Sequence, residues 1–219
     1  MLYTVADTHF NHENIIKYCD RSFCLTDFER ESIQAIRERC PNDTRAVREF
    51  KISQESVDRM DDIIINSINA VVQPNDTFYI LGDFCFARKD FSIVKGYRDR
   101  INCKHIHFIL GNHDYFTDEE YLTVFETVDH YKEVNFNKTK FVMCHYAMVV
   151  WNNSFRGSIM LHGHSHSTLE EWKRQHMPGL PLFDVGFDEW RGPVSFEDLI
   201  HRANMLKNQV EEIDYPDMP

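Results

Sequence analysis

Side chains with metal-binding chemistry recur where apolar runs of the chain end. They are Asp7, His9, Asp83, Asn112, His145, His164 and His166. All offer nitrogen or oxygen atoms, and none offers a thiolate. Each cluster alone is a weak signal, because Asp-x-His and Gly-Asp also occur as capped strand ends and ordinary turns. Together they are more specific, since these ligands suffice for two ions if one carboxylate bridges them.

The charge of such a site indicates its substrate. Two dications carry more positive charge than Asp7, Asp83 and a bridging hydroxide return, and the Asn and His ligands are neutral. A cationic surplus favours an anionic phosphate over a peptide or a sugar. Sites with two metals are a recurring device for phosphate ester hydrolysis. The residues therefore predict a two-metal phosphoesterase.

The order of the motifs carries a family resemblance. The series is Asp7-x-His9, Gly82-Asp83, Gly111-Asn112-His113-Asp114, His145 and Gly163-His164-x-His166. It resembles the calcineurin-like metallophosphoesterase superfamily over the chain from Asp7 to His166. The opening Asp7-Thr8-His9-Phe10-Asn11-His12 further resembles a branch of small prokaryotic and phage-borne members. The fold that this resemblance implies is a four-layer α/β/β/α sandwich, with two facing mixed β-sheets flanked by helices.

The resemblance also implies roles for these residues. One metal would be held by Asp7, His9, Asp83 and His166, and Asp83 would bridge to a second metal completed by Asn112, His145 and His164. A hydroxide bridging the metals would attack phosphorus in line with the leaving group. His113 would act as the general acid, and Asp114 would orient its imidazole. Mn²⁺ is the expected metal, with Fe, Zn²⁺, Ni²⁺ or Co²⁺ as alternatives, because ligands of this kind accept all of them.

Departures from the family pattern narrow the range of expected substrates. Protein Ser/Thr phosphatases carry Gly-Asp-x-x-Asp-Arg-Gly, whereas this chain has Gly82-Asp83-Phe84-Cys85-Phe86-Ala87-Arg88. A protein phosphatase is therefore not expected. Small phosphodiesters or nucleotides are favoured over monoesters, on the family resemblance and the lack of an evident dianion clamp. The alternatives are a nuclease acting on DNA or RNA, a non-catalytic scaffold on the same fold, and a metal-dependent oxidation centre.

Three further residues are candidates for contact with the substrate phosphate. They are Arg156, Arg21 and His12. A guanidinium matches phosphate geometry through two parallel hydrogen bonds. The alternative for each is a surface charge or a local hydrogen bond.

Composition limits the partners. The 219 residues include 24 Lys and Arg against 35 Asp and Glu, for a formal net charge of −11. Such a chain lacks the positive surplus that non-specific binding to nucleic acid or anionic membranes requires. The 6 cysteines show no CxxC pair, and no apolar run reaches the roughly 20 residues of a membrane span. We expect a cytoplasmic protein with reduced thiols, and the sequence leaves its oligomeric state open.

The elements that must position these residues alternate between strand and helix, then become mostly strand. Expected strands are Leu2–Val5, Thr77–Leu81, His105–Leu110, Tyr131–Phe136, Lys140–Cys144, Ile159–Leu161 and Leu182–Phe187. Expected helices are 14–19, 26–39, around 57–68, 88–100, 118–125 and from about 195, with 41–51 as a loop. The pattern predicts one α/β domain over 1–219, with a helical insertion around 26–51. The sequence does not indicate the role of this insertion.

Overall fold

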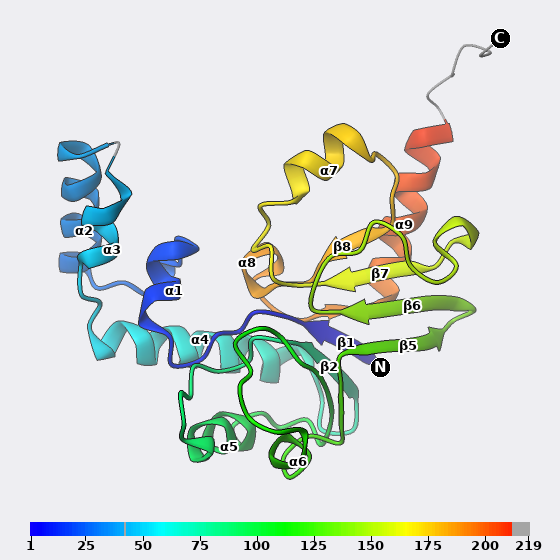
Figure 1. Cartoon of the computed structure of the whole chain (residues 1–219), viewed down its shortest axis with the longest axis horizontal. Coiled ribbons are helices and arrows are strands. Elements are labelled where there is room, and N and C mark those ends of the chain that lie inside the picture. Colours follow the sequence, from blue (N-terminus) through cyan, green and yellow to red (C-terminus); the bar gives the residue numbers. More distant parts are fainter. Residues whose placement is uncertain (42, 212–219) are drawn as a thin grey trace.

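Two mixed β-sheets form the centre of the structure, and helices flank them (Figure 1). The computed structural model describes residues 1–41 and 43–211. The strands are β1 Leu2–Val5, β2 Thr77–Leu81, β3 His105–Ile109, β4 Thr127–Asp129, β5 Tyr131–Phe136, β6 Thr139–Cys144, β7 Ile159–His162, β8 Leu182–Asp184 and β9 Val194–Ser195. The α-helices are α1 Glu13–Tyr18, α2 Asp27–Arg39, α3 Thr44–Glu49, α4 Gln54–Val71, α5 Phe91–Asp99, α6 Asp118–Tyr121, α7 Glu170–His176, α8 Phe187–Trp190 and α9 Phe196–Glu211, and short 3₁₀ turns cover Ser22–Cys24 and Ser154–Arg156.

The first sheet has the strand order β4-β3-β2-β1-β9, and the second has the order β5-β6-β7-β8. Strands β1 to β4 pair in parallel, and β9 pairs antiparallel to β1. In the second sheet β5 and β6 form an antiparallel hairpin, while β6, β7 and β8 run parallel. The carboxyl ends of parallel strands meet at one edge of a sheet, which is where ligands bind in open α/β folds.

Burial on both faces explains the continuous apolar runs of the central strands. In β2, Phe78 and Ile80 join the cluster on the helix side, whereas Tyr79 and Leu81 join the cluster between the sheets. In β6, Phe141 lies between the sheets, and its neighbour Val142 packs on the outer face. The two sheets are therefore held together by a shared apolar layer.

Helix α4 supports the first sheet from outside. Its buried positions include Met60, Ile64 and Ile68, at the spacing of one helical face. These side chains belong to the same cluster as Val5 and Phe78. The Ser53 side chain caps the helix by accepting a hydrogen bond from the Ser56 amide.

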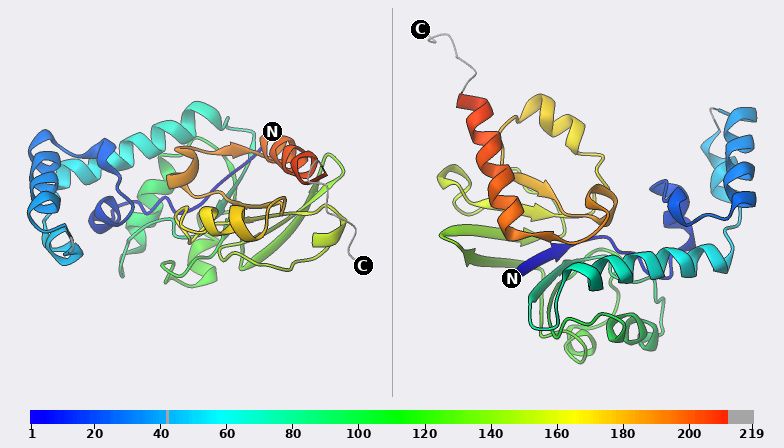
Figure 2. Two further views of the ribbon diagram at one scale, coloured as in Figure 1. Left: turned by 90° about the horizontal axis from the view of Figure 1, so that it is seen from above. Right: turned by 180° about the vertical axis from the view of Figure 1, so that it is seen from behind.

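Helices α2 and α3 lie apart from the sheets, beyond one end of α4, in each view of Figure 2. A capping box at Thr26 and Glu29 opens α2, at the position expected from the sequence. The expected loop over 41–51 was wrong in part, because α3 forms within it. The Asp43 side chain caps α3 by accepting from the Arg45 amide.

Other boundaries differ from the expected ones. The predicted strand Leu182–Phe187 ends at Asp184, because the chain turns at Gly186 into α8. The predicted helix 88–100 begins only at Phe91, after the Asp90 cap. The hairpin of β5 and β6 is confirmed, and its turn residues Asn137 and Lys138 have φ values of 48° and 65°.

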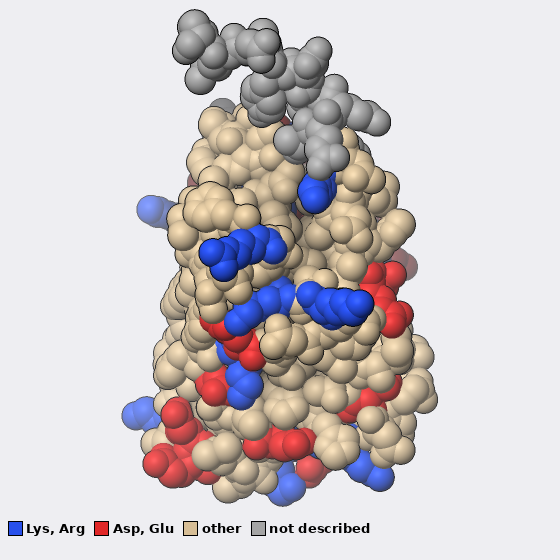
Figure 3. All heavy atoms as spheres, turned by 90° about the vertical axis from the view of Figure 1, so that its right-hand side faces the viewer, with Lys and Arg blue, Asp and Glu red and all other residues tan. Residues whose placement is uncertain are grey.

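Figure 3 shows the face at the right of Figure 1, where β1 begins. Lys and Arg gather near its middle, and Asp and Glu lie mainly toward one end. In Figure 1 this is the side on which β1 and β6 begin, whereas the candidate ligands follow the carboxyl ends of the strands. Among the described residues, no helix has both the length and the apolar character to cross a membrane.

Candidate metal centre

Loops from both sheets meet at the carboxyl ends of their strands. The amides of Asp7 and His9, after β1, donate to the carbonyls of Gly82 and Asp83, after β2, at 3.1 and 2.9 Å. In the second sheet the Gly163 amide donates to the His145 carbonyl at 3.0 Å. This backbone pairing brings the motifs expected from the sequence to one place.

Most of the candidate ligands have an unusual backbone conformation. Asp7, His9, Asp83, His164 and His166 all have positive φ, between 44° and 66°. Residues with a side chain adopt this left-handed region only at a cost, and such residues concentrate at functional sites. Five strained positions in one cluster indicate that the fold holds these side chains for a purpose other than stability.

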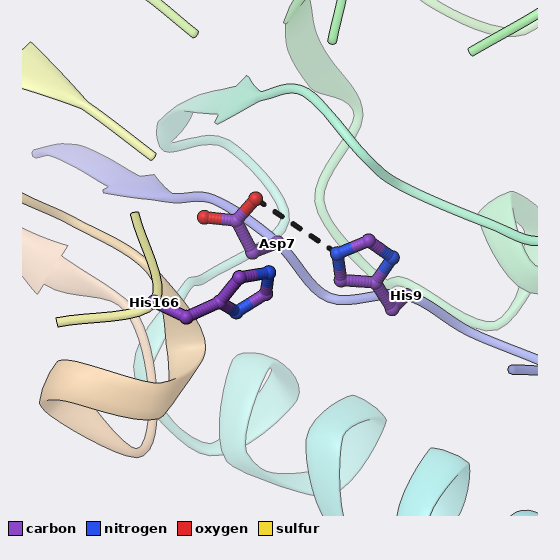
Figure 4. A group of neighbouring side chains, drawn as sticks. All are labelled: Asp7, His9 and His166. Carbon is purple, nitrogen blue, oxygen red and sulfur yellow. Dashed lines mark ion pairs between the residues drawn. The ribbon is translucent and has the colours of Figure 1, made fainter. Parts of the chain in front are cut away.

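The first group of ligands consists of Asp7, His9 and His166 (Figure 4). One ligand atom from each lies within 4.8 Å of the others. Oδ2 of Asp7 accepts a hydrogen bond from the His164 amide at 2.9 Å. Oδ1 of Asp7 and Nε2 of His9 are buried, have no hydrogen-bond partner and lie 4.0 Å apart. Two buried atoms that face each other without a hydrogen-bond partner fit the donors of a shared cation.

The second group consists of Asp83, His145 and His164, again within 4.8 Å. Nδ1 of His145 lies 2.8 Å from the Leu81 carbonyl, so it carries the proton and Nε2 presents a lone pair. That lone pair faces Oδ1 of Asn112 at 3.1 Å and Oδ2 of Asp83 at 3.6 Å. Acceptors that converge in this way repel one another unless a cation lies between them.

Asp83 links the two groups. Its Oδ1 accepts a hydrogen bond from the His113 amide at 2.8 Å. Its Oδ2 lies 3.5 Å from Nε2 of His9 in one group and 3.6 Å from Nε2 of His145 in the other. One carboxylate oxygen therefore faces both groups.

Two glycines allow the close approach of these loops. A Cβ atom on Gly163 would lie 2.5 Å from Oδ2 of Asp7, and one on Gly111 would lie 2.4 Å from Oδ1 of Asp83. Both distances are shorter than any ordinary contact. Only glycine leaves room for the carboxylates at these points.

The electrostatics of the centre favour a bound cation. Burial, together with Asp184 and Asp83, raises the pKa of Asp7 well above its ordinary value. Burial lowers the pKa of His9 well below its usual range and also lowers the pKa of His145, so both imidazoles are neutral and have a lone pair to offer a cation. Buried carboxylates without compensation are costly, and a metal ion supplies that compensation.

A third group, Cys19, His166 and Asp188, also has its ligand atoms within 4.8 Å. It fits a metal less well. The Asp188 carboxylate is already paired with the Arg21 guanidinium at 2.8 Å. The first two groups, with nitrogen and oxygen donors alone, are therefore the better candidates for a metal site.

Arg21 does not fit its predicted role as a substrate contact. Its side chain is 0% exposed, and its five N–H donors reach Asp188, Met60 and the carbonyls of Asp7 and Thr8. No donor is left for a phosphate. The sequence indicated a guanidinium suited to phosphate, but it could not indicate that this group has buried partners.

Asp114 also differs from its predicted role. Its carboxylate accepts from the amides of Gly111, Asp83 and Phe84 at 2.8, 2.8 and 3.2 Å. It therefore holds the loops after β2 and β3 together, and desolvation raises its pKa to about 7. The His113 imidazole instead pairs through Nδ1 with the hydroxyl of Tyr115 at 3.0 Å.

The structure brings His12 and His113 beside the ligands. The His12 ring lies 5.5 Å from that of His9 and 6.4 Å from that of His113, and it stacks on Phe86 at 4.4 Å. Burial lowers the pKa of His12 to about 4, so the ring is neutral near pH 7. Arg156 lies exposed on its 3₁₀ turn, and its predicted contact with substrate stays a prediction.

Two carboxylates of the centre were missed by the sequence analysis. Asp184 accepts from the Ser165 hydroxyl at 2.5 Å and the Ser167 amide at 3.0 Å, so it shapes the loop that carries His164 and His166. Asp188 pairs with Nδ1 of His166 at 2.7 Å. The available signal was weak, since both follow a short apolar run without a recognised motif.

The chain resembles two proteins whose names state no function. It is 28% identical over 172 residues to the uncharacterized protein MJ1445 of Methanocaldococcus jannaschii, covering 78% of this chain and 73% of that protein. Its fold is similar to the crystal structure of the protein of unknown function AQ665 from Aquifex aeolicus. That match has a TM-score of 0.57 at 19% identity and covers 92% of this chain and 98% of the other. No protein-family model matches the chain.

Proposed function

We propose that the chain is a dinuclear metal-dependent phosphoesterase of the calcineurin-like metallophosphoesterase superfamily, with the four-layer α/β/β/α sandwich of that superfamily. The observation that carries the proposal is the position of Oδ2 of Asp83, 3.5 Å from Nε2 of His9 and 3.6 Å from Nε2 of His145. Two groups of ligands that share one carboxylate oxygen match the requirement of a two-metal site.

The ligand sets follow from the two groups. Asp7, His9, Asp83 and His166 would hold one ion, and Asp83, Asn112, His145 and His164 the other. When bound, such ions supply Lewis acidity to the phosphoryl oxygens and lower the pKa of water. Mn²⁺ is the proposed metal, and Fe, Zn²⁺, Ni²⁺ and Co²⁺ suit the same donors.

His113 is the proposed proton donor. Its ring lies 5.7 Å from that of His9, and Nδ1 is engaged by the Tyr115 hydroxyl at 3.0 Å, which leaves Nε2 free to face a substrate. As water adds to phosphorus and the bond to the leaving oxygen breaks, Nε2 of His113 gives that oxygen its proton. Asp114 supports this step indirectly by fixing the loop on which His113 lies.

A cavity beside His12 is suited to the leaving group. It has a volume of about 290 Å³, and its lining includes His12, Glu13, Gln54, Phe86 and Arg88. An amide group, a neutral imidazole, an aromatic ring and one charge of each sign favour a polar organic group there. The proposed substrates are therefore small phosphodiesters or nucleotides.

The test compares two esters in the presence of Mn²⁺. We expect the protein to hydrolyse bis-p-nitrophenyl phosphate faster than p-nitrophenyl phosphate, and a chelator to abolish both activities. Asp83→Asn should reduce turnover by more than about 100-fold, because even the loss of a group behind a ligand costs 10- to 100-fold. Asp76→Asn, which changes a buried carboxylate at the other end of β2, should leave turnover unchanged. An inert wild-type protein would refute the proposal, whereas a clear monoester preference would refute only the diester part.

The rival functions predict different results in the same preparation. A nuclease would cut single- or double-stranded DNA at low salt more readily than it cleaves small esters. An oxidation centre would consume oxygen with Fe²⁺ and leave phosphate esters intact. We expect the protein to hydrolyse small phosphate esters, and we expect neither DNA cleavage nor oxygen consumption.

A further inference from the structure

A buried ion pair lies directly behind the first group of ligands. Nε and one terminal nitrogen of Arg21 donate to the two carboxylate oxygens of Asp188 at 2.8 and 2.9 Å. The Arg21 side chain is 0% exposed, and the Asp188 side chain is 6% exposed. A charged pair of this kind is expensive to desolvate and is weak evidence for a contribution to stability. Its contacts with the metal centre give it another role.

Both partners of the pair contact the first group. Oδ2 of Asp188 lies 2.7 Å from Nδ1 of His166, and the remaining donors of Arg21 reach the carbonyls of Asp7 and Thr8 at 2.7 and 2.9 Å. The ion pair thus links the backbone of Asp7, through Arg21, to the imidazole of His166, through Asp188, although Asp7 follows a strand of the first sheet and His166 a strand of the second. With Nδ1 engaged by a carboxylate, the ring of His166 presents Nε2 to the centre.

The second group is oriented by different atoms. The Leu81 carbonyl sets the His145 ring, and the Asp114 carboxylate accepts from the amides of Asp83 and Phe84. Neither Arg21 nor Asp188 has a recorded hydrogen bond to these groups among the described residues. The His145 ring and the Asp83 loop therefore have supports of their own, and the direct link between Asp7 and the second group is the hydrogen bond from the His164 amide to Oδ2 of Asp7.

We propose that Arg21 and Asp188 are positioning residues that preset Asp7 and His166 for the first ion, and that they act much less on the second ion, whose ligands His145 and Asp83 are held by other atoms. This inference rests on the proposed two-metal function. Asp188 is not itself a ligand, because both its oxygens are held by a guanidinium that would repel a neighbouring dication.

The test measures ion binding directly. Wild type and Asp188→Asn are dialysed against a series of free Mn²⁺ concentrations, and the Mn²⁺ bound per chain is counted by elemental analysis. The wild type should bind two ions. In Asp188→Asn one ion should bind 10- to 100-fold more weakly, while the affinity for the other stays within about twofold. Arg21→Lys keeps the charge but loses the fork-shaped geometry, so it should weaken the same ion.

The matched control is Glu29→Gln. Glu29 is also a buried carboxylate that accepts several hydrogen bonds, but it lies at the start of α2. This variant should bind both ions as the wild type does. A folded Asp188→Asn protein with wild-type affinity for two ions would overturn the inference, as would an equal loss of both ions. Should Asp188→Asn fail to fold, Arg21→Lys gives the same readout.

Two further outcomes distinguish failure of the positioning role from failure of the proposed two-metal function. A wild-type protein that binds no ions would defeat the proposed function, whereas two ions in both proteins would defeat the positioning role alone. With Co²⁺, thiolate charge-transfer absorption that disappears in Cys19→Ser would mean that the Cys19, His166 and Asp188 group holds an ion. That result would overturn the inference, because Asp188 would then be a ligand.

Discussion

His113 differs from the ligands around it in how it takes part in the centre. Its main-chain amide holds Oδ1 of Asp83 at 2.8 Å, while its imidazole is turned toward Tyr115. A change of side chain to alanine keeps this main-chain N–H and its hydrogen bond to Asp83. Under the proposed function, the backbone of this residue would serve ion binding and its side chain would serve the chemistry.

This division predicts the effect of His113→Ala. The variant should bind two Mn²⁺ ions as the wild type does, since the hydrogen bond to Asp83 remains. Turnover of esters with a poor leaving group, such as a dinucleoside monophosphate, should fall by about 10²–10⁴-fold, the usual contribution of a general acid. Esters with a p-nitrophenolate leaving group need less protonation and should be affected less. Equal losses on both kinds of ester would contradict the assignment.

At the residue scale, the sequence predicted which candidate ligands lie close together, but it did not predict the hydrogen-bond partners of each side chain. Asp7, His9 and Asp83 were recognisable because their types suit a metal and they follow apolar strands. The partners of an imidazole depend on contacts between distant segments, and Arg21 meets Asp188 across 167 positions of the chain. For the same reason Asp114 was assigned to its neighbour His113, whereas the fold gives it three backbone amides.

At the element scale, Glu29 joins the start of α2 to the start of α4. Its carboxylate accepts from the amides of Thr26 and Ser53 at 3.0 and 2.6 Å and from the Ser56 hydroxyl. These hydrogen bonds outweigh the desolvation that opposes them and lower the pKa of Glu29 to about 2. The ionised side chain therefore stabilises the folded state.

We predict that Glu29→Gln lowers the free energy of unfolding by about 1.5–3 kcal/mol at pH 7, the usual range for hydrogen bonds to a charged group. The folded-state pKa lies below the ordinary value of 4.5, so this stabilisation is present above that pH and is lost as pH falls toward 2. Urea unfolding at several pH values would measure it. A difference between wild type and variant that widens on acidification would contradict the prediction.

Strongly periodic elements could be predicted from the sequence, and weakly periodic ones could not. Helix α4 and strand β2 carry clear apolar patterns, because each packs on the core. Helix α3 was missed because it is short and polar, and its cap at Asp43 was the one local signal. Strand β8 was predicted too long because the apolar run continues through Val185 and Phe187 into α8.

At the scale of the whole molecule, the centre depends on the contact between the two sheets. The first sheet carries Asp7 and Asp83, and the second leads to His145. Phe141 lies fully buried between the sheets, with its ring 4.4 Å from that of Phe196. Any loss of this packing would move the ligand groups relative to each other.

Phe141→Ala should therefore lower the free energy of unfolding by about 3–5 kcal/mol, as expected for removal of a buried aromatic ring. Phe155→Ala changes a side chain that is 93% exposed, so it should alter stability by less than about 0.5 kcal/mol. Urea denaturation of both variants would measure these two changes in the free energy of unfolding. Similar effects of the two substitutions would contradict the described core.

A crystal structure of the protein grown with Mn²⁺, with data collected for anomalous scattering, tests the central claim most directly. The two-metal account predicts two peaks about 3.5–4 Å apart, with the Asp83 carboxylate between them. One peak or none at Asp83, in a protein saturated with Mn²⁺, would contradict it.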